Sequence, residues 1–179
     1  MKIAIGTSRI VLIFKTFIIK FPIIRLRKAI KLALRSFAKN QLGHTLRRGN
    51  YQMFGTIQFF LFRGIFENWI ELIFYKKTHL KLLLPTHYSF FGLFNIMEKG
   101  NKVKMDDIDF WAQLYYFTDG KVFVSAHTFH NLNNFCVKDG KLKIADYGAR
   151  KIHPVLKKYG DKIYNEFNLN FDRKKFYKS

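Results

Sequence analysis

Residues 127–148 read HTFHNLNNFCVKDGKLKIADYG, and they contain the most informative pattern in the chain. A polar segment ends at Asn134, two short apolar runs follow, and an Asp-Tyr-Gly turn starts at Asp146. The pair Asp139-Gly140 separates the apolar runs, and such a pair is a strong hairpin signal because both positions of a two-residue turn need positive φ. We therefore expect strands at 135–138 and 141–145, with Asn134 just before the hairpin and Asp146 just after it.

The segments outside this hairpin predict a mixed α+β chain, because alternating and continuous apolar runs indicate strands and a period near 3.6 indicates helices. Short strands are expected at 2–5, 10–14, 16–21 and 122–125, and strand-like segments at 82–91 and 93–97. Helices are expected at 24–42, 64–75 and 106–117. No internal repeat or flexible linker divides the sequence.

The loop, hairpin and Asp-Tyr-Gly turn resemble the catalytic loop and metal-binding aspartate of the protein-kinase superfamily. In that family an Asn and an Asp at these positions hold magnesium on the phosphates of ATP. The resemblance implies that Asn134 and Asp146 are metal ligands, and their oxygen donors suit magnesium.

Three further parts of the pattern precede the hairpin in the order that this family requires. The turn at residues 6–9 resembles a shortened phosphate-covering hairpin, which gives Gly6 and Ser8 a place beside the nucleotide. Lys20 then resembles the lysine that reaches the phosphates, and Glu71, or less favourably Glu67, its partner carboxylate. The segment 94–100, with Met97 near its centre, resembles the strand that leads to the adenine contact. The pattern is most similar to small kinase-like proteins of phages and prophages.

The sequence also departs from the family pattern. Phe129 occupies the position of the catalytic aspartate, with His127 at the position of the family's histidine, and phenylalanine can neither accept nor orient a proton. His130 or Asn131 could take over that role as base or orienter. Gly6 is the only glycine in the phosphate-covering turn, and the sequence ends at Ser179, 31 residues after Gly148.

The resemblance covers about residues 3–148 and implies a reduced protein-kinase-like fold. A β-rich N-terminal lobe with a paired helix is expected at 1–99, with a basic insertion at 22–48, and a truncated C-terminal lobe at 100–179. Peptide phosphorylation is not expected, because the truncated lobe leaves no room for a peptide platform.

The composition also narrows the structural and functional classes to which the chain can belong. The hydrophobic content of 49% is enough for a core. The single cysteine, Cys136, excludes a disulfide framework or a multi-cysteine zinc site and fits a reducing cytoplasm, which would be the host cytoplasm if the protein is viral. No apolar run is long enough to span a membrane. The sequence also lacks the minimal motifs of P-loop proteins, zinc proteases and serine hydrolases.

Positive charge is concentrated in the first third of the chain. The net charge is +20, and residues 1–66 contain 13 Lys or Arg and no acidic residue. In the expected helix at 24–42, residues 26, 30, 34 and 37 are apolar and residues 28, 31, 35 and 39 are basic. The basic face is either simply solvated or a contact for phosphates or a membrane surface. The aromatic and basic residues at 59–77 are either core or a stacking surface for single-stranded nucleic acid.

Two functions from different classes follow. In the first, the chain is a kinase-like protein or pseudokinase that binds Mg-ATP through Lys20, Glu71, Asn134 and Asp146. In the second, it is a non-catalytic basic interaction module that binds nucleic acid or an acidic protein surface. The complete set of four residues favours the first function, and Phe129 with the high charge favours the second.

Overall fold

The computed structural model describes residues 1–38, 56–121, 129 and 131–173, which form α-helices and antiparallel strands. The backbone divides into two compact units that interleave along the chain. Unit 1 consists of Met1–Trp69 and Tyr88–Ile96, and unit 2 consists of Ile70–His87 and Met97–Ser179. The α+β class expected from the sequence is confirmed. The single boundary after residue 99 stays a prediction about domains, which this division does not test.

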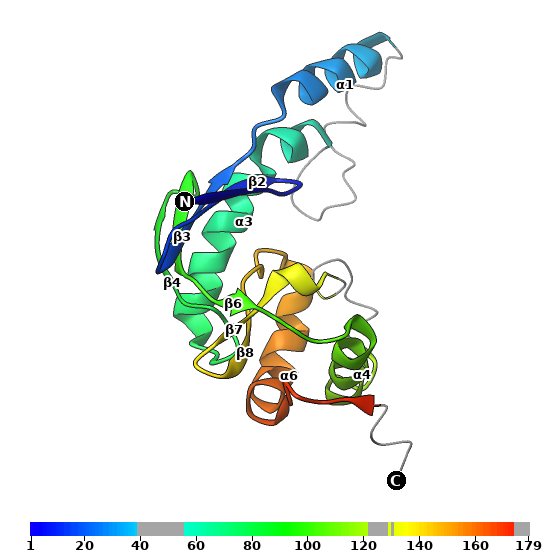
Figure 1. The fold of residues 1–179 in the computed structure, drawn as a ribbon. Coiled ribbons are helices and arrows are strands. Elements are labelled where there is room, and N and C mark those ends of the chain that lie inside the picture. The colour runs from blue at the N-terminus through cyan, green and yellow to red at the C-terminus, as the bar shows by residue number, and fades with distance from the viewer. Residues whose placement is uncertain (39–55, 122–128, 130, 174–179) are drawn as a thin grey trace. The chain divides into compact units, whose positions relative to one another are not determined.

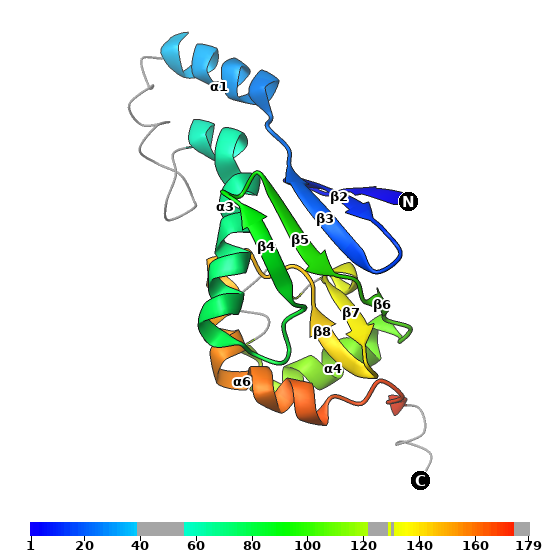
Figure 2. The same cartoon turned by 90° about the vertical axis from the view of Figure 1, so that its left-hand side faces the viewer.

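Unit 1 contains most of a five-stranded sheet with the order β1-β2-β3-β5-β4, whereas the first two residues of β4 and the last two of β5 belong to unit 2. Its strands, shown in Figures 1 and 2, are β1 Lys2–Ile5, β2 Arg9–Ile13, β3 Phe17–Pro22, β4 Thr86–Phe90 and β5 Phe94–Glu98. The first three are antiparallel, with Val11 opposite Ala4 on one side and Lys20 on the other. The strands expected at 10–14 and 16–21 are therefore confirmed with ends shifted by one residue.

Helix α3, Thr56–Thr78, contributes its first part to unit 1 and is longer than the helix expected at 64–75. At Gly64, α3 lies unusually close to the backbone of the turn before β2 and of the end of β3. A Cβ built on Gly64 would lie 2.4 Å from the carbonyl oxygen of Ser8 and 2.8 Å from Cα of Pro22. Real Cβ atoms do not approach so closely, so this contact requires glycine.

Helix α1, Leu26–Ala38, also belongs to unit 1 and follows β3. The backbone N–H of Arg25 donates to the carbonyl of Phe60, 3.0 Å away, and so ties the start of α1 to α3. Ala29 is buried, whereas Leu26, Ile30, Leu34 and Phe37 are exposed. The sequence alternative of a packed helix with one solvated basic face therefore needs correction, because an apolar stripe of α1 is also exposed. Residues 39–42 of the expected helix lie outside the described residues.

Unit 2 combines a three-stranded antiparallel sheet with helices. The sheet has the order β6-β7-β8, with β6 at Asn101–Lys102, β7 at Phe135–Lys138 and β8 at Lys141–Ile144. Helix α4 spans Asp107–Phe117 and α6 spans His153–Glu166, and α6 packs on β8 and α4. The short 3₁₀ helices are Leu132–Asn134 and Arg150–Ile152.

The hairpin turn and the helix expected at 106–117 are both confirmed in unit 2. Asp139 and Gly140 have φ of 51° and 69°, as a two-residue hairpin turn requires. Asp106 caps α4, because its carboxylate accepts from the backbone N–H groups of Ile108 and Asp109. The strand expected at 122–125 lies outside the described residues.

One expected strand is interrupted. Leu82, Leu83 and Leu84 are buried, and Leu83 forms an isolated bridge with Ile144, but β4 begins only at Thr86. Pro85 has no N–H to donate to a sheet, which explains why the predicted segment at 82–91 is not one continuous strand. The core of unit 2 contains fully buried side chains of Leu82, Leu83, Leu84, Phe110, Leu114, Phe129, Leu142, Ile144, Tyr147, Ile152, Leu156 and Ile163.

Candidate functional site

The candidate site in unit 2 lies at the open end of the β7–β8 hairpin. The carbonyl oxygen of Asn134 accepts hydrogen bonds from the backbone N–H groups of Ala145 at 2.8 Å and Asp146 at 3.4 Å. These bonds bring the residue before the hairpin next to the residue after it. Asn134 and Asp146, which are separated by 12 positions in the sequence, are therefore neighbours, and both are half-buried.

Tyr147 fixes the backbone directly after Asp146. Its ring is fully buried, and its hydroxyl donates to the carbonyl of Leu84 at 2.9 Å and lies 2.5 Å from Oγ1 of Thr86. Its N–H donates to Oε1 of Glu71 at 3.3 Å, and its carbonyl accepts from His153. Every polar group of Tyr147 thus has a partner, which a buried tyrosine needs.

His153 supports the same backbone from α6. Its ring stacks on Phe74 with centroids 3.6 Å apart, and Nε2 lies 2.8 Å from the carbonyl oxygen of Tyr147. Burial lowers the pKa of His153, and the positive charges of Arg150 and Lys157 lower it further, against the opposing effect of the Tyr147 hydrogen bond. A neutral imidazole that donates through Nε2 satisfies this geometry.

The donor types of Asn134 and Asp146 fit magnesium. Magnesium prefers oxygen ligands and usually binds through one or two carboxylates, with substrate phosphates and water completing its shell. The carboxylate of Asp146 and the amide oxygen of Asn134 match that preference, and the backbones of the two residues are hydrogen-bonded to each other. Among the described residues, no group of three or more His, Cys, Asp and Glu side chains is placed to hold a metal ion.

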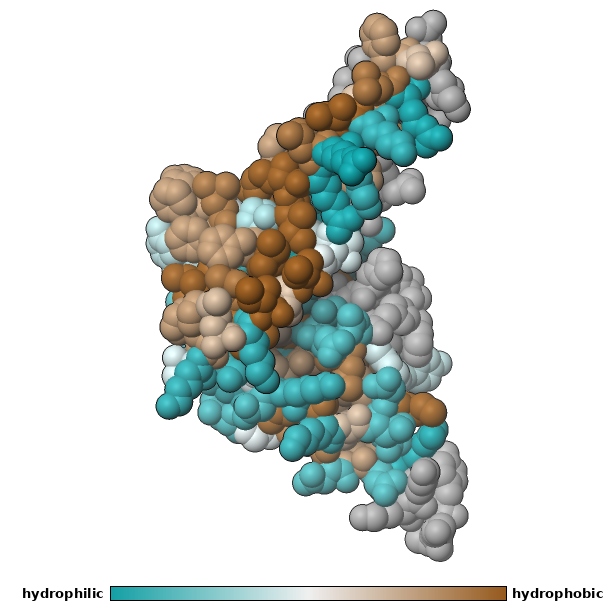
Figure 3. All heavy atoms as spheres, turned by 45° about the horizontal axis from the view of Figure 1, so that its top comes forward, coloured by the Kyte–Doolittle hydropathy of each residue, from teal (hydrophilic) through white to brown (hydrophobic). Residues whose placement is uncertain are grey.

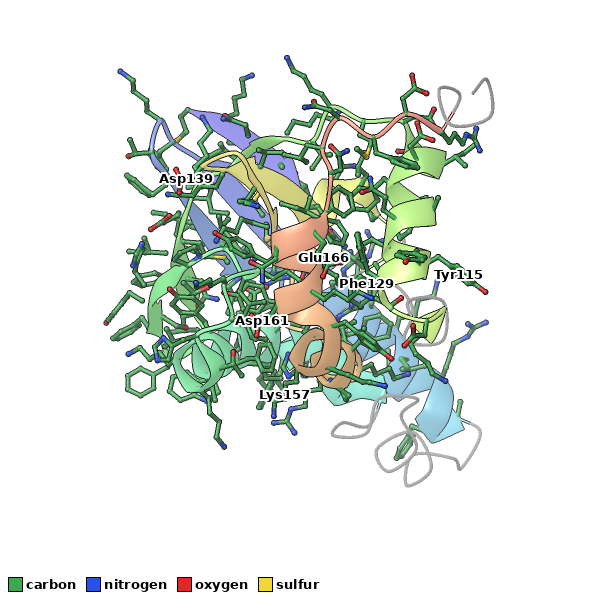
Figure 4. All side chains as sticks on the ribbon, turned by 90° about the horizontal axis from the view of Figure 1, so that it is seen from below. Tyr115, Phe129, Asp139, Lys157, Asp161 and Glu166 are labelled. Atoms are coloured by element: carbon green, nitrogen blue, oxygen red, sulfur yellow. The ribbon has the colours of Figure 1, made fainter. Side chains whose placement is uncertain are left out.

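Phe129, the residue predicted to replace the family's catalytic aspartate, is part of the core. Phe129 is fully buried, and its ring centroid lies 6.2 Å from that of Phe135. Figure 4 shows Phe129 inside unit 2, whereas Tyr115 extends outward from α4. Because Phe129 contributes packing and no proton-accepting atom, it cannot orient a substrate hydroxyl.

Asn131 and His130 are expected to take over the role of the catalytic aspartate, and of the two the structure describes Asn131. Asn131 is exposed, and its side-chain oxygen accepts from the N–H of Asn133 at 2.9 Å, so it caps the 3₁₀ helix before the hairpin. His130 and His127 lie outside the described residues. The catalytic role of Asn131 or His130 stays a prediction.

Comparisons with known proteins found no matching family model, no similar curated protein and no similar solved structure. The resemblance to kinase-like proteins therefore remains a hypothesis from the sequence. No helix within the described part of the chain combines the length and apolar character needed to cross a bilayer.

Met97 and Glu71, the other predicted residues of unit 2, are both fully buried. Met97 lies on β5, and the next residue, Glu98, donates its N–H to the carbonyl of Pro85 at 3.0 Å. The Glu98 carboxylate also pairs with Lys138 and contacts His87. Although burial opposes ionisation, these partners lower the pKa of Glu98.

The predicted residues of unit 1 lie on its N-terminal strands and turn. The N–H of Gly6 donates to the carbonyl of Arg9 at 2.8 Å, which closes the turn. The buried Ser8 hydroxyl donates to the carboxylate of Glu67, which also pairs with Arg9 at 3.7 Å and Arg63 at 2.6 Å. This arrangement gives Glu67 cationic partners within unit 1.

Lys20 is buried on β3, where its carbonyl accepts from the side chain of Asn68 at 3.2 Å. Asn68 also donates to the carbonyl of Gly92 at 2.9 Å and accepts, through its own carbonyl, from Asn95 at 2.8 Å. The expected pair of Lys20 with Glu71 stays a prediction, because the two residues belong to different units.

Sequence reasoning missed Asn68, Tyr147 and His153 as organising residues. Tyr147 had a usable signal, because it lies inside the Asp-Tyr-Gly turn. Asn68 and His153 had none, since their importance comes from backbone groups that are distant in sequence.

Proposed function

We propose that the chain is a kinase-like nucleotide-binding protein with an atypical or lost phosphotransfer activity. The observation that carries this proposal is the placement of Asn134 and Asp146 on adjacent backbone positions, with Tyr147 anchored behind them. Magnesium bound there would neutralise nucleotide phosphates. Asp146 and Asn134 would hold the ion through their side-chain oxygens.

Several features of the chain support a kinase-like arrangement. Gly6 and Ser8 lie in a turn between two strands, Lys20 on the third strand, Glu71 on the following long helix, and Met97 on the fifth strand. This order is the one that the sequence resemblance requires. The reduced protein-kinase-like fold, with ATP and magnesium as its ligands, is proposed on that basis.

The loss of ordinary transfer chemistry is proposed from Phe129. A protein kinase needs a residue that orients the attacking hydroxyl, and the buried Phe129 ring has no atom that can do so. The proposed role is therefore binding or switching by nucleotide, rather than peptide phosphorylation.

Thermal unfolding with and without ATP and magnesium tests nucleotide binding. At a ligand concentration about 100 times Kd, a ligand that binds only the folded chain stabilises it by about 2.7 kcal/mol, which raises Tm by roughly 5–10 °C for a chain of this size. Asp146→Asn should abolish the magnesium-dependent part of the rise. Its backbone bond to Asn134 is unaffected by that change.

Asp161→Asn is the matched control, because Asp161 is exposed on α6 in the same unit. It should keep the full rise in Tm. Absence of any rise for the unmodified chain, or a full rise in Asp146→Asn, would contradict the proposal. The first of these results would favour the second function, a non-catalytic basic module that binds nucleic acid or an acidic protein surface.

A further inference from the structure

Helix α1 has an apolar stripe that the described residues of its own unit leave exposed. Leu26, Ile30, Leu34 and Phe37 follow one another at spacings of four, four and three residues, which places them on one side of a helix. Their exposed fractions are 57%, 50%, 65% and 72%. A continuous row of four large exposed apolar side chains is unusual for a surface that faces only water.

The stripe is not the side by which α1 packs on its own unit. Ala29, on a different side of the helix, is almost completely buried, and Leu32 and Ala33 are half-buried. The packed side and the exposed stripe are thus separate parts of one wide apolar face. Ile24, just before the helix, is 55% exposed and extends the apolar surface toward the sheet.

Basic side chains border this stripe. Arg27, Lys28, Lys31 and Arg35 occupy the sector of α1 next to the stripe and are all exposed. Figure 3 shows the result as a brown band along α1 with hydrophilic side chains beside it. No acidic residue occurs in residues 1–66, so no carboxylate in that segment opposes the approach of a negative surface.

We infer that the apolar stripe of α1 and its basic border form a surface that binds an anionic lipid bilayer. A helix with one apolar side and a Lys- and Arg-rich side lies in the plane of a membrane, with its apolar side chains at the boundary of the acyl chains. The basic side chains then face the anionic headgroups, which attract them. Both halves of that arrangement are present on α1.

A nucleic acid fits the same helix less well. Its phosphates would attract the basic side, but single strands gain their additional affinity by stacking bases on aromatic rings. Three of the four side chains in the stripe are aliphatic, so they lack the aromatic rings on which such bases stack. A bilayer covers the stripe and attracts the basic side at once.

Co-sedimentation of the full chain with lipid vesicles tests this surface. The probe is a vesicle of phosphatidylcholine and phosphatidylserine, compared with a vesicle of phosphatidylcholine alone, in buffer without nucleotide or magnesium. We expect binding to the mixed vesicle and binding about tenfold weaker, or absent, to the neutral one. Because no nucleotide is present, this result is independent of the nucleotide site.

The variant Leu34→Gln with Phe37→Gln should lose sedimentation with the mixed vesicle. Its matched control is Ile108→Gln with Tyr116→Gln, which removes two apolar side chains that are 53% and 72% exposed on α4 in unit 2. The control should bind like the unmodified chain. Thermal unfolding of both variants shows whether each remains folded, and exposed positions should tolerate the change.

Three results would overturn the inference. The unmodified chain could fail to sediment with the mixed vesicle, or the α1 variant could bind as well as the control. The third is a dimer of the unmodified chain, seen by sedimentation velocity without lipid, that Leu34→Gln with Phe37→Gln converts to a monomer. That result would assign the stripe to a contact between two copies of the chain.

Discussion

The backbone N–H of Tyr147 donates a hydrogen bond to Oε1 of Glu71, although the two residues are 76 positions apart. Both groups are buried, so each replaces water that the other would need. The bond joins the second part of α3 to the backbone that follows Asp146. A shift of this part of α3 within unit 2 would therefore move the backbone next to Asp146, the candidate metal ligand.

Replacing Glu71 by Ala should destabilise the chain by about 1–3 kcal/mol, because the N–H of Tyr147 would remain buried without this acceptor. Glu71→Gln retains a side-chain oxygen and should recover most of the loss. Urea unfolding measures both values. Equal stability of the Ala and Gln variants would show that the hydrogen bond is unimportant.

Tyr147→Phe should cost about 1–2 kcal/mol, since it removes the hydroxyl shared by the Leu84 carbonyl and Thr86. Tyr116→Phe is the control, because Tyr116 is 72% exposed on α4. The control should change stability by less than about 0.5 kcal/mol. Similar losses in the two variants would argue against a special role of the buried hydroxyl.

Stability should decrease as pH falls because of His153. Burial lowers its folded-state pKa below the ordinary value of 6.5, so the unfolded chain takes up the proton first. The free energy of unfolding that depends on neutral His153 is fully present above pH 6.5. It is lost as the pH falls through the folded-state pKa of His153. Urea unfolding from about pH 7.5 to about pH 5 should show a smaller loss in His153→Gln than in the unmodified chain.

The acid dependence of Glu98 is present in both proteins and cancels in the comparison, because its lowered pKa does not involve His153. Identical pH profiles for the two proteins would mean that His153 has the same pKa in the folded and unfolded states.

Gly64→Ala and Gly160→Ala should have opposite effects although both glycines lie within helices. Alanine is normally better in a helix by about 0.5–1 kcal/mol. At Gly160 the nearest side-chain atom is 3.7 Å from the added Cβ, so we expect stabilisation of that size. At Gly64 the Cβ would overlap the Ser8 carbonyl, and we expect a loss of about 1–3 kcal/mol.

Thermal unfolding of the two alanine variants checks this pair directly. Stabilisation by Gly64→Ala would mean that α3 can move away from the N-terminal hairpin without cost.

Short-range signals in the sequence predicted several local features of the chain correctly. Asp139-Gly140 specified the hairpin turn because few other pairs accept positive φ at both positions, and Asp106 specified the start of α4 by capping it. The sequence also supplied the residue types of the candidate site at Asn134 and Asp146. These signals succeed because each depends on neighbours within a few positions.

Which groups meet and which faces are covered became visible only once the elements were placed within each unit. The period of α1 shows that the helix has an apolar side, but burial of Ala29 and exposure of Leu34 depend on what packs beside it. The partners of Tyr147 come from α3, α6 and the segment before β4. Periodicity shows which residues share one side of a single helix or strand. Long-range hydrogen bonds and burial depend on how several helices and strands are placed, and local sequence patterns do not report that placement.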